Sequence, residues 1–193
     1  MKFKLALLAV ITVFGGAFIF VANKSGDKTI TNMSPADKLA NMIGKPAPDF
    51  SLPSHNGQTF NLAQQRGKKV VLFFNEGIMC YPACWNQMAS LGSDGRLNND
   101  KVVSASIVAD TKDQWVEAVK KMPELGQGTL LLDTDMAVSR QYGMLLLESS
   151  MHRGSKPGHT YVIVDEEGIV QYTSDDPQMG IRNDAIVAEL SKI

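Results

Sequence analysis

Residues 75–87, NEGIMCYPACWNQ, contain both cysteines of the chain, Cys80 and Cys84, separated by three residues. The run before them, residues 70–75 (VVLFFN), is apolar without alternation, which predicts a central strand covered on both faces. Residues 85–91 after them can form a helix. Two thiols at a strand-to-helix junction are suited to redox chemistry or to binding a soft metal ion.

The overall composition limits the classes of protein to which this chain can belong. Its 193 residues carry a formal net charge of -1, a length that suits one well-packed domain with a tail. The balanced charge offers no basic stripe, so we expect no nucleic-acid partner. Two cysteines are too few for a disulfide framework, so the pair either has a local, special role or is accidental.

The N-terminus contains an uncharged apolar stretch, residues 5–22, preceded by Lys2 and Lys4. As a helix it would span about 27 Å, close to the bilayer core of about 30 Å. We therefore expect residues 1–22 to be an uncleaved membrane anchor, with a cleaved signal peptide as the alternative. The lysines predict that the rest of the chain is extracytoplasmic, and the polar residues 23–40 are expected to be a linker.

Residues 41–193 are expected to form one domain. Short strand patterns at residues 49–52 and 58–61 flank an Asn-Gly turn, which favours an N-terminal β-hairpin. Later strands are predicted at residues 70–75, 102–109, 130–133, 161–165 and 169–172, and helices at residues 85–91, 110–121, 133–143 and 184–192. This alternation predicts an α/β fold with a central mixed sheet flanked by helices, in the order of the thioredoxin fold.

Three stretches carry a resemblance to a known family: residues 43–52 (IGKPAPDFSL), 66–74 (RGKKVVLFF) and 160–170 (TYVIVDEEGIV). They resemble the redoxin group, which includes the peroxiredoxins (the alkyl hydroperoxide reductase/thiol-specific antioxidant superfamily) and membrane-tethered thiol-disulfide reductases. The resemblance spans most of residues 42–173. It implies a thiol-dependent oxidoreductase that needs no cofactor and acts on hydroperoxides or on a protein thiol/disulfide partner.

The chain departs from the family pattern at the positions that surround the first cysteine. Peroxiredoxins carry Pro and Thr or Ser seven and three residues before the peroxidatic cysteine, where counting back from Cys80 gives Phe73 and Gly77. The family's arginine precedes the closing strand, where this chain has His159, and the nearest arginine is Arg153. The thioredoxin-type C-x-x-C is lengthened here by one residue.

These residues lead to a redox hypothesis. Cys80 occupies the place of the N-terminal thiol of a redoxin, near helix N–H groups that lower a thiol pKa, and would attack the substrate. Cys84, one turn later and about 6 Å away, would resolve the mixed disulfide. Glu76 is a candidate proton acceptor, or else a solvent-exposed loop carboxylate. Arg153 would meet an anionic substrate or only solvent.

A copper-binding alternative rests on the same cysteines. The C-x-x-x-C spacing with a later histidine, on an anchored redoxin fold, also resembles the Sco-type copper chaperones. Two thiolates and one imidazole suit copper. That resemblance implies copper held by Cys80, Cys84 and His159, since His159 would fall in the loop that faces the cysteines. His152 is a second candidate for the imidazole.

Overall fold

The computed structural model describes residues 33–193 of the chain. The membrane helix expected within residues 5–22, and most of the expected linker, lie outside the described residues. Between residues 33 and 193 no helix is both long and apolar enough to cross a membrane.

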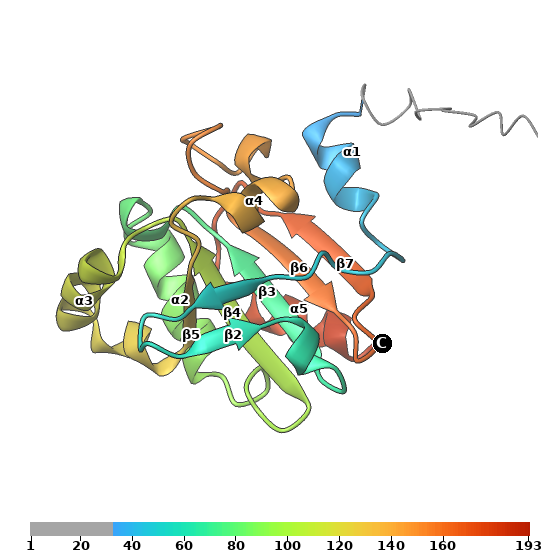
Figure 1. Cartoon of the computed structure of the whole chain (residues 1–193), viewed down its shortest axis with the longest axis horizontal. Helices are drawn as coiled ribbons and strands as arrows, with labels where there is room; N and C mark the ends of the chain where they lie inside the picture. Colours follow the sequence, from blue (N-terminus) through green and yellow to red (C-terminus); the bar gives the residue numbers. More distant parts are fainter. Residues whose placement is uncertain (1–32) are drawn as a thin grey trace, which may run out of the picture.

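A five-stranded sheet forms the centre of the described structure, with strand order β5-β4-β3-β6-β7 (Figure 1). Its strands are β3 (Lys69–Phe74), β4 (Val102–Val108), β5 (Thr129–Leu132), β6 (Thr160–Val164) and β7 (Val170–Asp175). Strands β3, β4 and β5 pair in parallel, whereas β6 pairs antiparallel with both β3 and β7. This mixed sheet confirms the predicted thioredoxin-like architecture.

Strand β3 lies in the middle of this sheet and is buried on both faces. Its side chains alternate between two hydrophobic cores: Val70, Leu72 and Phe74 belong to one core. Val71 and Phe73 belong to the other. Because both faces are covered, every position of the strand can be apolar without exposing a hydrophobic face, which explains the unbroken apolar run.

Different elements cover the two faces of the sheet (Figure 1). The first face packs against α1 (Pro35–Ala40), the separate hairpin of β1 (Ser51–Pro53) and β2 (Thr59–Asn61), and α4 (Ala137–Gln141). The second face packs against α2 (Ala83–Ser93), α3 (Lys112–Lys121) and α5 (Asn183–Leu190). Short 3-10 turns complete the chain: η2 (Ala63–Gln65), η3 (Gly77–Met79), η4 (Pro123–Gln127) and η5 (Met144–Leu146).

Several element bounds differ from the expected ones. Helix α1 lies within the expected linker, and its Leu39 is buried in the first core, so packed structure begins before residue 41. Helix α4 is shorter than predicted because Asp133, expected to start it, instead accepts hydrogen bonds from the backbone of Val138 and Ser139.

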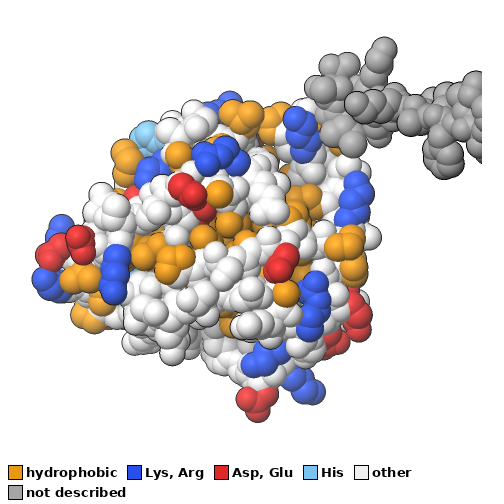
Figure 2. Space-filling model, viewed as in Figure 1, with side chains coloured by type: hydrophobic (Ala, Val, Ile, Leu, Met, Phe, Trp, Pro, Cys, Tyr) orange, Lys and Arg blue, Asp and Glu red, His pale blue; other side chains and the backbone are white. Residues whose placement is uncertain are grey.

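Charged side chains are mixed on the surface. On the face seen in Figure 2, lysines and arginines are interspersed with aspartates and glutamates and do not gather into one basic patch. This distribution agrees with the near-zero net charge of -1. It offers nothing on that face that would attract the phosphate backbone of a nucleic acid.

Candidate redox site

The two cysteines lie at the carboxyl end of β3, on the second face of the sheet. The chain leaves β3, makes the turn η3 and reaches Cys80, whereas Cys84 belongs to the first turn of α2. They form a disulfide with their Cα atoms 5.3 Å apart. Cys84 is fully buried and Cys80 is 3% exposed. Between them, Tyr81-Pro82 is the only cis peptide bond among the described residues.

On the Cys84 side the disulfide meets a buried histidine and tyrosine. The Cys84 Sγ lies 3.6 Å from Nδ1 of His159, and Nε2 of His159 lies 2.9 Å from the Tyr161 hydroxyl. A disulfide sulfur carries no proton and can only accept, so a hydrogen bond between these two atoms requires the proton on Nδ1. In this tautomer Nε2 accepts a hydrogen bond from the Tyr161 hydroxyl.

The buried position of this pair determines its charge. Burial lowers the pKa of His159 to about 4, although the nearby Asp176 works in the opposite direction. Burial also raises the pKa of the Tyr161 hydroxyl. At neutral pH both side chains are therefore uncharged, and His159 presents an N–H donor to Cys84 rather than a positive charge.

On the Cys80 side the disulfide meets apolar groups close to the surface. The Cys80 Sγ lies 3.8 Å from Sδ of Met179, which is a van der Waals contact because the oxidised sulfur has no hydrogen to donate. Met79 and Tyr81, the sequence neighbours of Cys80, are both exposed. Trp85 packs between Tyr81 and Trp115 and belongs to the core that contains both cysteines.

Glu76 lies beneath the cysteine loop and is fully buried, so the expectation of a solvent-exposed carboxylate was wrong. Its Oε1 accepts hydrogen bonds from the Ser150 hydroxyl (3.2 Å) and the backbone N–H of His152 (2.9 Å). Its Oε2 lies 3.2 Å from Nδ1 of His152, at ion-pair distance but without hydrogen-bond geometry. Glu76 and His152 therefore join the cysteine loop to residues 150–152.

Gly77 adopts a backbone conformation that few other residues can adopt. Its φ is +67°, and an added Cβ would lie 1.7 Å from Oδ2 of Asp110. That carboxylate is itself held, because Oδ2 accepts from the N–H of Ile78 (3.0 Å) and Oδ1 from Nζ of Lys156 (2.8 Å). The threonine or serine of the peroxiredoxin pattern has no room at this position.

The candidate arginine lies elsewhere. Arg153 is exposed and donates to the backbone carbonyl of Glu148. Arg182, which the sequence reasoning missed, is paired with Asp176, and the charges of both act on His159. Met179 was missed as well. No spacing rule points to these three residues, because they follow the closing strand in an irregular segment.

Cys80, Cys84 and His159 are brought together as the copper-binding alternative expected. Their donor atoms all lie within 4.8 Å of one another. In the disulfide state the two sulfurs are bonded to each other, and thiolates, the form that binds soft metals, would be available only after reduction. The geometry alone therefore serves redox chemistry directly and metal binding only in the reduced form.

Comparisons with known proteins favour the redox hypothesis over the copper-binding alternative. The chain is 29% identical to peroxiredoxin Bcp of Escherichia coli K12 over 150 residues, covering 75% of this chain and 92% of the relative. The reduced 2-Cys peroxiredoxin of Plasmodium vivax is similar in structure, with TM-score 0.62 and 25% identity, over 76% of this chain and 78% of that chain. A putative protein disulfide isomerase from Bacteroides thetaiotaomicron has the same fold, with TM-score 0.59 and 20% identity, over 78% and 88% of the two chains.

These relatives do not favour the copper-chaperone alternative. Peroxiredoxins use cysteine redox chemistry without a cofactor, in agreement with the expectation from the resemblance. The sequence model of the AhpC/TSA family matches residues 43–173, well over half of the chain. The chain therefore belongs to the AhpC/TSA family and is a peroxiredoxin-like, thiol-dependent oxidoreductase.

Proposed function

We propose that this protein is a membrane-anchored, extracytoplasmic thiol oxidoreductase whose Cys80–Cys84 pair cycles between dithiol and disulfide. The observation that carries the proposal is the closed disulfide with the His159 N–H against Cys84. One sulfur thus lies at the edge of the site, and the other is placed beside a buried hydrogen-bond donor.

With a protein disulfide as substrate, the thiolate of reduced Cys80 attacks one substrate sulfur. A mixed disulfide forms and the other substrate sulfur leaves as a thiolate. Cys84, as a thiolate, then attacks Sγ of Cys80, which closes the Cys80–Cys84 bond and releases the second substrate thiolate. Two electrons have passed from the pair to the substrate, and the two released thiolates take up the protons that the two cysteines lost.

The reset by an external dithiol runs in reverse. A thiolate of the reductant attacks Cys80, the Cys80–Cys84 bond breaks, and Cys84 leaves with the electron pair. The Nδ1–H of His159, 3.6 Å away in the closed state, can then donate to the new thiolate. Hydrogen bonds to charged groups are stronger than those to neutral ones, so His159 stabilises Cys84 as a leaving group.

The surroundings of Cys80 favour protein disulfides over hydroperoxides as substrates. Gly77 supplies no hydroxyl and has no room for one, and Arg153 is exposed and donates to the backbone carbonyl of Glu148. With a hydroperoxide, Cys80 would form a sulfenic acid as the O–O bond breaks and an alcohol leaves. Cys84 would then displace water to close the same disulfide.

The membrane part of the proposal rests on the sequence. Residues 5–22 are apolar and uncharged over a length that matches a bilayer core, and two lysines precede them. An extracytoplasmic position also suits a stable disulfide, because oxidising compartments preserve such bonds. Fractionation of cells expressing the full chain, with protease added from outside, tests this part: we expect membrane-bound protein that is digested once the outer face is accessible.

The redox part is tested with the full chain in detergent. Reduced protein is mixed with a scrambled-disulfide protein or with hydrogen peroxide, and substrate reduction is followed with reduced thioredoxin, a protein dithiol, as the electron source. We expect Cys80→Ser to abolish turnover and Cys84→Ser to leave a trapped mixed disulfide. Full activity in Cys80→Ser with loss in Cys84→Ser would reverse the assignment, and inactivity of the unaltered chain on both substrates would refute the proposed function.

A further inference from the structure

The side chain of Met179 covers the outer side of Cys80. Its Sδ lies 3.8 Å from the Cys80 Sγ, and Met179 packs against the core that contains both cysteines. Met179 itself is half-buried, so it has the cysteine on one side and solvent on the other. Cys80 is only 3% exposed although its neighbours Met79 and Tyr81 are open to solvent.

A network centred on the Asp176 carboxylate holds Met179 in this position. The carboxylate accepts from the backbone N–H groups of Gln178 (3.3 Å) and Gly180 (3.1 Å), on either side of Met179. It also accepts two hydrogen bonds from Arg182, at 2.8 and 2.7 Å. Met179 has a φ of +50°, a left-handed conformation that is uncommon for a residue with a side chain and needs such support.

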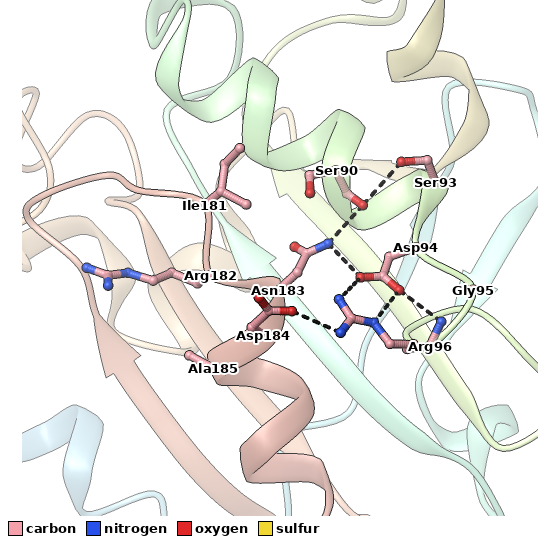
Figure 3. A pocket seen from close by; sticks show the side chains of 10 residues that line it. All are labelled: Ser90, Ser93, Asp94, Gly95, Arg96, Ile181, Arg182, Asn183, Asp184 and Ala185. Atoms are coloured by element: carbon pink, nitrogen blue, oxygen red, sulfur yellow. Dashed lines mark hydrogen bonds and ion pairs between the residues drawn. The ribbon is translucent and has the colours of Figure 1, made fainter.

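Both ends of this segment are fastened to the elements that carry the redox site. The N–H of Asp176 donates to the carbonyl of His159 (2.9 Å), and the N–H of Arg182 donates to Gln87 of α2 (2.7 Å). Asn183, which follows, donates to the Ser90 carbonyl and to Asp94. Figure 3 shows this junction, where Arg182 points away from the Asp94 side chain.

The hollow in that figure, about 560 Å³, does not itself suggest a ligand site. Its Arg96 is already paired with Asp94 and Asp184, both at hydrogen-bond distance. The residues that line it matter for another reason: their hydrogen bonds join the first turn of α5 to the end of α2. Residues 176–182 are thus a short strap with both ends fixed and one side chain laid over Cys80.

We propose that Met179 is the residue that controls access to Cys80, held closed by Asp176 and Arg182. The inference rests on the proposed function, in which a partner thiolate attacks Cys80 and Cys84 leaves. Since Cys84 is fully buried and Cys80 nearly so, no thiolate reaches either sulfur of the closed disulfide until Met179 moves. Reduction then requires a partner that displaces this side chain, which selects a docked protein over a small thiol.

The test measures the second-order rate of reduction of the Cys80–Cys84 disulfide by dithiothreitol, using the full chain in detergent. We expect Met179→Ala to react at least about tenfold faster than the unaltered chain, because access depends on the population of the open form. Asp176→Asn should also react faster, since it weakens the strap without touching either sulfur. Met179→Leu, which keeps the bulk, should remain slow.

Two control variants separate access from general loosening. Met79→Ala alters an exposed neighbour of Cys80, and Met88→Ala removes a buried side chain from α2. We expect Met79→Ala to react at the unaltered rate and Met88→Ala to lower the unfolding temperature without matching the rate of Met179→Ala. An unaltered rate in Met179→Ala, or an equal increase in Met79→Ala or Met88→Ala, would overturn the proposal. This assay needs no physiological substrate, so its outcome is independent of the turnover assays above.

Discussion

The two sides of the Cys80–Cys84 disulfide have opposite surroundings. Cys84 is fully buried against His159 and Tyr161, in a chain of polar groups that are all paired. Cys80 lies at the edge of the same core, in contact with the thioether of Met179 and with exposed neighbours. In a symmetric pair either sulfur could be attacked. Here only Cys80 is near solvent, and only Cys84 has a donor that can stabilise it as a leaving thiolate.

The largest expected effect concerns the turn that presents Cys80. Gly77→Ala should lower the free energy of unfolding by roughly 3 kcal/mol, because it combines left-handed strain with overlap of the Asp110 carboxylate. Gly95→Ala is the matched control, since its φ is not left-handed and open space surrounds its Cβ position. Urea unfolding measures both. Equal stability of the two variants would mean that the turn before Cys80 has room for a side chain at position 77.

The next largest effect comes from His159 on the Cys84 side, which should make the free energy of unfolding depend on pH. The pKa of His159 is about 4 when folded against 6.5 for a free histidine, so the unfolded chain binds a proton first as the pH falls. Stability should therefore decrease by about 3 kcal/mol from above pH 6.5 to pH 4. His159→Phe should lose this part of the slope, whereas the contribution of His55, whose pKa is also lowered by burial, should remain.

A smaller effect is expected on the rate at which the disulfide opens. His159→Phe keeps a ring against Phe73 but removes the donor to Cys84, so reduction by dithiothreitol should slow by about 10–100-fold. This change is opposite in sign to that expected for Met179→Ala. If His159→Phe and Met179→Ala changed the rate of reduction in the same direction, the proposed difference between the Cys84 side and the Cys80 side would be contradicted.

The smallest effect is expected from Tyr161→Phe. The variant removes the hydroxyl that donates to Nε2 of His159 while keeping the stacked ring against Phe73. Nδ1 would then carry the proton only part of the time, and the rate of reduction should fall about fivefold, in line with the loss of one ordinary hydrogen bond. Nitrogen-15 NMR of the imidazole gives an independent readout, because the two tautomers have distinct shifts.

Much of the fold was predictable because its signals are local. The apolar run of β3 predicted a strand covered on both faces, and a helix expected over residues 110–121 is α3, which begins with a capping box of Thr111 and Gln114. The Asn-Gly turn correctly predicted the β1–β2 hairpin. Each of these patterns acts between residues that are neighbours in the chain, so it can be recognised without knowing the tertiary structure.

The candidate site was predictable only in part. The spacing of Cys80 and Cys84 allowed a disulfide, but the burial of Glu76 was missed, because its partners Ser150 and His152 lie 74 and 76 residues away. Sequence reasoning identified Gly77 as a departure from a family pattern without a reason for it. The reason is a contact with Asp110, which reaches Gly77 only because β4 lies beside β3.

The sequence by itself determined the paired thiols, the central strand that precedes them and the α/β class, because these depend on residue type and short spacing. The tertiary structure alone decided which environment each sulfur receives. His159 and Met179 lie 75 and 99 residues from the cysteines they contact. Contacts over such separations follow from the order of strands in the sheet and from the path of the segment after β7. Those features arise from the packing of the whole domain rather than from any local pattern.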